Sequence, residues 1–267
     1  MSKSYRVILF GIDGASPFLI KKWINELHNF KKLQDSGVYA KLESSIPFLS
    51  SPAWNCMFTG KNPGKIGIYD FLVYDPITKY IKVADIHDQK SLSLWDIASI
   101  YGKRVCVINV PTLYPPYEIN GIMVSGGLFY KYERGHYAYP TYIEKVLDRI
   151  TGGYEIIPPV RLIERGREQE YMEHFARVLK KRFKAFKFLL ENFKWDLFIG
   201  VVFILDSVQH YFWHHMDEHH PRYIKNSAFK DTIKFFYKII DDFLGCLLYT
   251  SDAADELDGV DLGGRRI

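Results

Sequence analysis

Two aspartates in this chain each follow an apolar run, and carboxylates are suited to binding a cation. Asp13 comes directly after the apolar run 7–12, and Asp206 comes directly after the apolar run 197–205. His210 lies four residues beyond Asp206. If the chain is helical there, residues four apart share one face, so the carboxylate and the imidazole can bind one metal ion. The pattern therefore predicts cation-binding chemistry.

The apolar runs indicate how these groups are positioned. Both runs have the composition of strands buried on both faces of a parallel sheet, and we predict strands at 5–12 and 197–205. In open α/β sheets, ligands bind at the carboxyl ends of the strands, so Asp13 and Asp206 are expected to converge there. The alternatives are that Asp13 caps the following turn, and that Asp206 and His210 form a structural hydrogen-bonded pair.

The rest of the chain alternates between helical and strand patterns, which is typical of an α/β fold with a mostly parallel sheet between helices. The predicted helices cover 17–36, 52–59, 92–101, 167–193 and 222–244, and the further strands cover 38–44 and 104–110. Residues 111–165 are rich in Pro, Gly and Tyr and are expected to form a loop-rich lobe over the site. The basic residues in 180–187 are expected to form a solvated face.

A third candidate group lies at the start of the second predicted helix. Pro52 suits the first turn of a helix, and Ser51 is expected to be its N-cap. A helix N-terminus presents backbone N–H groups and the positive end of the helix dipole, which favour phosphate binding. Ser50 and Ser51 immediately precede the predicted start of this helix.

Together these features resemble the type I phosphodiesterase/nucleotide pyrophosphatase branch of the alkaline phosphatase superfamily. The resemblance covers residues 6–245 and is carried by Gly11-Ile12-Asp13-Gly14, the segment 47–70, Asn109-Val110-Pro111 with Tyr114-Pro115-Pro116, and Asp206-x-x-x-His210-x-Phe212-Trp213. It implies an alkaline phosphatase-like catalytic domain over 1–245. The implied activity is hydrolysis of phosphodiester or phosphomonoester bonds in a small phosphorylated substrate.

The resemblance also implies a role for each candidate residue. Ser50 would be the nucleophile and would form a phospho-serine intermediate. Asp13 would bind one metal ion together with Ser50, and Asp206 and His210 would bind a second. Two divalent ions are implied, with zinc as the expected metal and manganese as the alternative. The competing assignment of the nucleophile is Ser51.

Other readings remain open. A sulfatase and a metal-dependent phosphoglycerate mutase belong to the same superfamily, and a non-catalytic ligand-binding fragment is the alternative from another class. Ser50-Ser51-Pro52 fits the sulfatase S-x-P pattern, but Trp54 stands where sulfatases have Arg. Phe71 stands near the position of a phosphate-binding Asn in nucleotide pyrophosphatases, so the resemblance does not extend to nucleotide specificity. The histidines within 214–220 are expected to lie on the surface or at the substrate rim.

The end of the chain has a different composition. Residues 251–267 contain neither aromatic residues nor lysine. The segment 246–267 resembles translated sequencing-adapter read-through, and we expect a non-native, disordered tail; the alternative is a genuine acidic tail. The family's remaining metal ligands would lie beyond residue 245. We therefore expect an incomplete domain with weak metal binding and weak activity.

Composition restricts the class of protein. Hydrophobic residues make up 48% of the chain and aromatic residues 16%, which predicts a substantial core. The 3 cysteines have no CxxC spacing and are expected to be reduced thiols. The sequence shows no signal peptide and no apolar span of membrane length, so we expect a cytoplasmic protein without a membrane partner. The net charge is +4, but the sequence shows no RRM, helix-turn-helix or zinc-finger pattern, and no specific nucleic-acid binding is expected.

Overall fold

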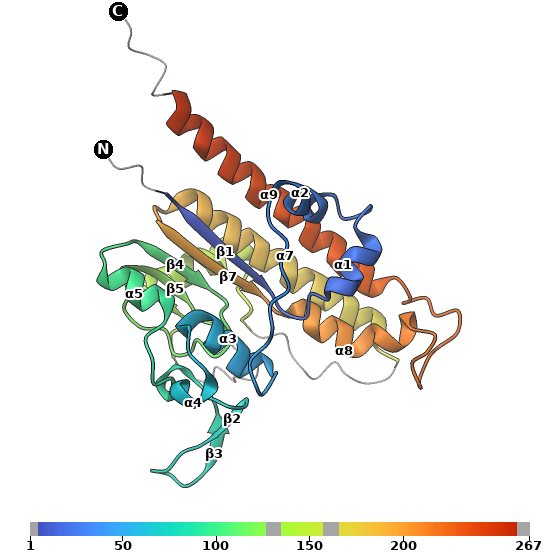
Figure 1. Cartoon of the computed structure of the whole chain (residues 1–267), viewed down its shortest axis with the longest axis horizontal. Helices are drawn as coiled ribbons and strands as arrows, with labels where there is room; N and C mark the ends of the chain where they lie inside the picture. The colour runs from blue at the N-terminus through green and yellow to red at the C-terminus, as the bar shows by residue number, and fades with distance from the viewer. Residues whose placement is uncertain (1–4, 127–134, 157–165, 261–267) are drawn as a thin grey trace, which may run out of the picture. The chain divides into compact units, whose positions relative to one another are not determined.

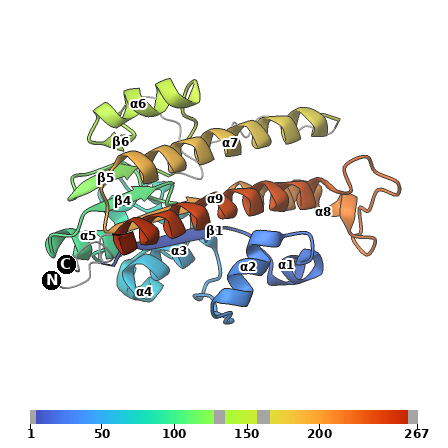
Figure 2. The ribbon, with the colours of Figure 1, turned by 90° about the horizontal axis from the view of Figure 1, so that it is seen from above.

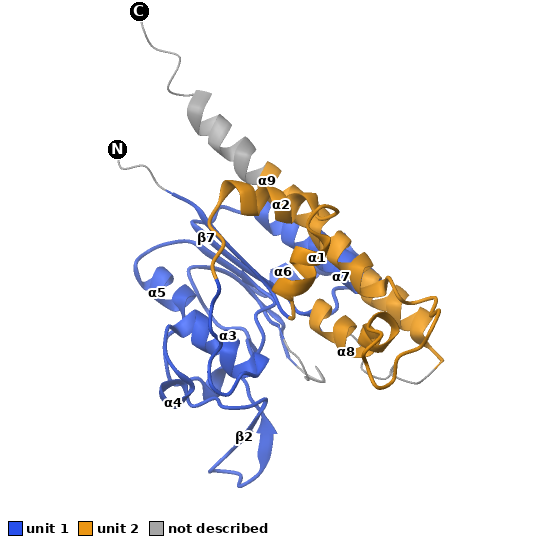
Figure 3. Cartoon of the chain, turned by 45° about the vertical axis from the view of Figure 1, so that its right-hand side comes forward, with its two compact units in different colours: residues 1–13, 41–162, 177–203 blue, residues 14–40, 163–176, 204–267 orange. Residues whose placement is uncertain are grey.

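The computed structural model describes residues 5–126, 135–156 and 166–260, with side chains to residue 249. The chain divides into two compact units, shown in Figure 3. Unit 1 comprises residues 1–13, 41–162 and 177–203, and unit 2 comprises residues 14–40, 163–176 and 204–267. The long helix α7 (Glu168–Asn192) contributes to both.

Among the described residues, unit 1 is built on a 5-stranded sheet with the order β1-β7-β4-β5-β6, of which Figure 1 labels the first four strands. The strands are β1 (Val7–Ile12), β4 (Val105–Ile108), β5 (Gly121–Val124), β6 (Ala138–Tyr139) and β7 (Leu197–Val202). Strands β1, β7, β4 and β5 run parallel, and β6 pairs antiparallel with β5. Every residue of β4 is buried, as expected of a parallel sheet covered on both faces. The predicted α/β fold with a mostly parallel sheet is confirmed.

Helices cover both faces of this sheet. Figure 2 shows α6 (Tyr142–Thr151) and α7 on one side of the sheet and α3 (Ser50–Thr59) on the other. Phe186 of α7 packs directly over Gly200, where any side chain would overlap its ring. Trp54 of α3 packs over Gly11 in the same manner. Glycines in β7 and β1 thus allow the covering helices to approach the strands closely.

The remaining elements of unit 1 are short. They are α4 (Pro63–Ile66), the hairpin β2 (Leu72–Tyr74) and β3 (Ile81–Val83), the 3-10 turn Ile86–Asp88, and α5 (Leu94–Ile100). The expectation of a loop-rich lobe over 111–165 is wrong in part, because β5 and β6 join the central sheet and α6 is a regular helix. Residues 127–134 and 157–165 of that segment lie outside the described residues.

Two predicted strands need correction. The structure has no strand over 38–44, where Val38 and Leu42 are exposed and no described strand lies alongside. A strand without a partner leaves its backbone N–H and C=O groups unpaired. A segment whose sequence favours β-structure therefore forms a strand only where another strand can pair with it. Strand β7 is also shorter than predicted, because α8 (Ile204–Met216) takes the last two residues of the apolar run 197–205.

Unit 2 is helical. It contains α1 (Pro17–Trp23), α2 (His28–Ser36), α8, α9 (Thr232–Val260) and the first part of α7. The single helix predicted over 17–36 is therefore wrong. The chain breaks before α2 because Asp241 of α9 caps its N-terminus, accepting hydrogen bonds from the backbone N–H groups of Asn29 at 3.0 Å and Phe30 at 2.8 Å.

Helix α9 differs from the sequence prediction at both ends. It begins at Thr232, ten residues later than the predicted residue 222, and it continues through the expected disordered tail to Val260. Residues 246–260 include Leu, Ala and Glu, which extend an existing helix readily. No helix within the described residues combines the length and the hydropathy that crossing a membrane requires.

Candidate active site

Helix α3 places Ser50 at its first position. The helix begins at Ser50 and ends at Thr59, where Gly60 adopts the left-handed conformation of a C-cap. The prediction that Ser51 is the N-cap is wrong, because Ser51 lies inside the first turn and its hydroxyl donates to the Asp70 carbonyl at 3.1 Å. Leu49 is the N-cap residue, and no side chain caps this N-terminus. The positive end of the α3 dipole is therefore not covered by a capping side chain.

Ser50 meets a carboxylate. Its hydroxyl donates to Asp13 Oδ1 at 3.3 Å, although the two residues are 37 positions apart. Asp13 follows β1, and its backbone N–H donates to the Val202 carbonyl at 2.7 Å, which extends the β1–β7 ladder by one residue. The end of a buried strand thus fixes the carboxylate, and the start of a helix fixes the hydroxyl.

Asp206 and His210 form a second pair within unit 2. Both lie on α8, and His210 Nε2 is 3.5 Å from Asp206 Oδ2. The predicted proximity of these residues across one helical turn is confirmed. Burial raises the pKa of Asp206, and the nearby His210 acts in the opposite direction. The His210 side chain is 74% exposed, so its imidazole is accessible from solvent.

The turn after Asp13 is held against α8. Gly14 has φ +73°, and an added Cβ would lie 2.7 Å from the Asp206 Cα. The Gln209 side-chain amide donates to the Gly14 carbonyl. The sequence alone does not identify Gln209, because its position between Asp206 and His210 does not indicate which backbone group its side chain contacts.

One histidine of the segment 214–220, His215, does not lie where the sequence predicts. His215 is buried, and its Nδ1 lies 2.7 Å from the Ser227 hydroxyl, so its predicted surface position is wrong. Burial lowers the pKa of His215. The sequence shows only a histidine-rich segment, whereas α8 turns His215 inward against Phe212 and Phe229.

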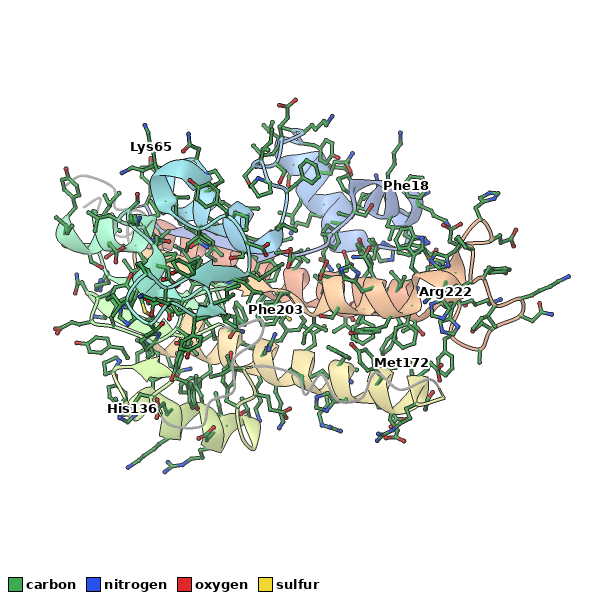
Figure 4. All side chains as sticks on the ribbon, turned by 90° about the horizontal axis from the view of Figure 1, so that it is seen from below. Phe18, Lys65, His136, Met172, Phe203 and Arg222 are labelled. Carbon is green, nitrogen blue, oxygen red and sulfur yellow. The ribbon has the colours of Figure 1, made fainter. Side chains whose placement is uncertain are left out.

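The chain turns from β7 towards α8 at Phe203, which is labelled in Figure 4. The guanidinium of Arg182 lies over this ring, with Cζ 4.3 Å from the ring centroid. Arg182 is fully buried and donates to the backbone carbonyls of Glu155 and Ile156. The expectation that the whole basic run 180–187 is solvated is therefore wrong at this residue.

The donor chemistry of the two pairs suits divalent metals. Carboxylate and imidazole groups bind zinc or manganese, and a serine oxygen can join them when it is deprotonated. Each pair supplies two donors, fewer than the three or four of a stable zinc site. Across the described part of the chain, no cluster of three or more His, Cys, Asp or Glu residues is arranged to hold a metal ion. The ligand types fit, whereas the number of ligands is that of a partial site.

Comparison with known proteins places this arrangement in context. The sequence matches the family model of type I phosphodiesterases/nucleotide pyrophosphatases over residues 7–257. No curated protein matches the sequence significantly. The structure is similar to a phosphonoacetate hydrolase from Sinorhizobium meliloti in complex with phosphonoacetate, with a TM-score of 0.59 and 18% sequence identity. That similarity covers 92% of this chain and 54% of the hydrolase.

Two mammalian structures show the same fold. The murine ectonucleotide pyrophosphatase/phosphodiesterase 5, an inactive form in complex with AMP, has a TM-score of 0.52 at 12% identity, over 94% of this chain and 53% of that one. The human protein of the same name has a TM-score of 0.52 at 13% identity, over 94% and 53%. The chain thus spans about half the length of these solved structures.

Proposed function

We propose a function from the premise that this chain belongs to the type I phosphodiesterase/nucleotide pyrophosphatase family. In this proposal the chain hydrolyses phosphoester bonds in small phosphorylated substrates, with Ser50 as the nucleophile. The observation that carries the proposal is the hydrogen bond from the Ser50 hydroxyl to Asp13 at the uncapped N-terminus of α3. The end of β1 positions the Asp13 carboxylate, and the start of α3 positions the Ser50 hydroxyl. The two groups therefore meet beside the N-terminus of α3, where backbone N–H groups attract anions.

The surroundings of Ser50 suit nucleophilic attack on phosphorus. A serine hydroxyl alone is a weak nucleophile at neutral pH and needs activation by a neighbouring group. Asp13 orients the hydroxyl by accepting its hydrogen bond, and the α3 dipole favours the alkoxide. Backbone N–H groups at the start of α3 would bind the phosphoryl oxygens. Ser50 Oγ, after losing its proton to solvent, would form a bond to phosphorus as the bond to the leaving alkoxide breaks, and water would then hydrolyse the phospho-serine and restore the hydroxyl.

Divalent metals complete the proposal. Asp13 with Ser50, and Asp206 with His210, would each hold one ion, with zinc expected and manganese as the alternative. Asp13 directly follows β1, and Asp206 lies on α8, the helix that follows β7. Strands β1 and β7 are paired in register from Val7–Leu197 to Ile12–Val202. An ion held by Asp13 and Ser50 would lower the pKa of the attacking hydroxyl, and divalent ions stabilise charge on phosphoryl oxygens.

The experiment compares neighbouring serines. We expect the chain to hydrolyse bis(p-nitrophenyl) phosphate or p-nitrophenyl phosphate only with added Zn²⁺ or Mn²⁺, and slowly because the ligand sets are partial. Ser50→Ala should lower kcat by about 10³-fold or more, because it removes the covalent route. Ser51→Ala should retain much more of the activity. Loss of activity in Ser51→Ala with normal rates in Ser50→Ala would assign the nucleophile to Ser51.

We also propose a cytoplasmic location, since Cys56 and Cys106 carry free thiols. Fractionation of the source cells with an antibody to the chain would test this location. Recovery of the protein in a secreted or periplasmic fraction would contradict it.

A further inference from the structure

The loop after β4 contains an unusual residue, Thr112. This threonine has φ +67°, in the left-handed region that β-branched residues rarely adopt. The flanking residues Val110 and Leu113 are buried, and the loop is closed by backbone hydrogen bonds from Leu113 to Val110 and from Gly126 to Leu113. Strained conformations of this kind persist only where the surroundings enforce them, and they are concentrated at functional sites.

The side chain of Thr112 reaches the helix that carries Ser50. Asn55 of α3 donates from Nδ2 to Thr112 Oγ1 at 2.9 Å, and both side chains are buried. The same Asn55 amide donates to the Ser51 carbonyl at 2.7 Å. Asn55 thus connects the strained loop to the first turn of α3.

The first turn of α3 is therefore fixed from three directions. The Ser51 carbonyl is held by Asn55, and the Ser51 hydroxyl donates to the Asp70 carbonyl. On the side of the sheet, Trp54 fills the space over Gly11. These contacts determine how the helix is rotated and shifted, and so where the Ser50 hydroxyl lies relative to Asp13.

We propose that Thr112 is a positioning residue for the nucleophile, acting through Asn55 to hold Ser50 against Asp13. This inference rests on the proposed function of Ser50. Reactive groups must be placed within a fraction of an ångström, and displacement by 1 Å can lower a rate by about 10²-fold. The presence of a threonine in the left-handed region, where glycine would be free of strain, is explained if its hydroxyl is needed.

Three substitutions of Thr112 distinguish the effect of its hydroxyl from the effect of its backbone strain. Thr112→Val keeps the shape and removes the hydroxyl, Thr112→Ser keeps the hydroxyl, and Thr112→Gly removes both the hydroxyl and the strain. Thr151→Val is the matched control, because Thr151 is equally buried in unit 1 and its hydroxyl donates to the Leu147 carbonyl of α6 at 2.7 Å.

Steady-state kinetics with Zn²⁺ or Mn²⁺ and thermal unfolding are measured for each variant. Thr112→Val should lower kcat about tenfold or more with KM little changed, while Thr112→Ser stays close to wild type. Thr112→Gly should lose as much kcat as Thr112→Val and have a higher Tm than that variant. Thr151→Val should lower Tm without lowering kcat. If Thr112→Val retains the wild-type kcat, or loses activity only in proportion to unfolded protein, the proposal is overturned.

Hydrogen–deuterium exchange makes the test independent of turnover. Faster exchange of the amides in residues 50–56 in Thr112→Val, with no change there in Thr151→Val, supports the positioning role. Unchanged exchange in that segment overturns it. If wild type and Ser50→Ala are equally inactive, the proposed function of Ser50 fails, and exchange alone decides whether Thr112 holds the helix.

Discussion

Ser50 and Ser51 are neighbours with different surroundings. The Ser50 hydroxyl donates to a carboxylate, whereas the Ser51 hydroxyl donates to a backbone carbonyl and is buried. A carboxylate can orient a hydroxyl and share a metal ion with it, but a carbonyl only fixes its position. The difference between the two serines therefore lies in their partners.

Gly14 provides a test at the level of one residue. We predict that Gly14→Ala lowers the free energy of unfolding by about 1–3 kcal/mol, because the residue has φ +73° and the new Cβ would lie 2.7 Å from the Asp206 Cα. Gly60→Ala is the control, with φ +65° and nothing within 4 Å of the added Cβ. Urea unfolding measures both. Equal losses in the two variants would show that the close approach to Asp206 adds nothing.

Single residues differ in how well the sequence predicts them. Asp206 and His210 could be paired from spacing alone, because residues four apart on a helix share a face. The burial of Arg182 could not be predicted, since it lies among lysines that look equivalent in sequence. Asn55 and Thr112 also escape prediction, because the contact joins residues 57 positions apart without any motif.

Helix α2 shows how a tertiary contact determines an element's boundary. Its N-terminus is capped from α9 by Asp241, which is buried. We predict that Asp241→Ala lowers the free energy of unfolding by about 0.5–2 kcal/mol, the range for loss of an N-cap. Asp242→Ala is the control, because Asp242 is exposed on the same helix. Similar Tm values for both variants in thermal unfolding would contradict the capping role.

Strands β4 and β7 are joined near their starts by Asp196 and Arg104. The Arg104 side chain and backbone N–H both donate to Asp196, which lowers the pKa of that carboxyl to about 2. A lowered pKa in the folded state means that this stabilisation is present above the unfolded pKa, about 3.9, and is lost as pH falls towards 2.

We predict that Asp196→Asn lowers Tm at pH 7 and that its difference from wild type shrinks as pH falls from 4 towards 2. Asp35→Asn is the control, because Asp35 pairs with Lys31 in an exposed position and should have little effect at either pH. A Tm difference for Asp196→Asn that is independent of pH would contradict the prediction.

At the level of elements, the sequence predicts well where hydrophobic periodicity is strong. The sequence predicts a helix over 167–193, and α7 is observed over Glu168–Asn192. The segment 38–44 has a strand-like sequence, but a strand exists only if another strand pairs with it, and this depends on the rest of the fold. The start of α2 likewise depends on Asp241, more than 200 positions away.

The whole molecule combines an α/β sheet in unit 1 with a helical unit 2, and each unit carries one of the proposed ligand pairs. The fold could be predicted because alternating strands and helices leave few topologies. Metal binding to the folded state alone should stabilise it by mass action. We predict that Zn²⁺ raises Tm only at high concentration, and that a chelator reverses the shift.

The variants His210→Ala and Asp13→Asn should each reduce this shift, because each removes a proposed ligand. His136→Ala is the control, since His136 is an exposed histidine paired with Glu144 on α6. A Zn²⁺-dependent Tm shift that is unchanged in both ligand variants, or equally reduced in His136→Ala, would place the bound metal elsewhere.

The most direct test of the proposed mechanism is to locate the covalent intermediate. The chain is incubated with p-nitrophenyl phosphate and Zn²⁺, quenched in acid, digested, and mapped by mass spectrometry for a phosphorylated peptide spanning α3. The proposed mechanism predicts one phosphoryl group on Ser50, absent from Ser50→Ala and present in Ser51→Ala. Phosphate on Ser51, or metal-dependent turnover without any phosphorylated peptide, would contradict it.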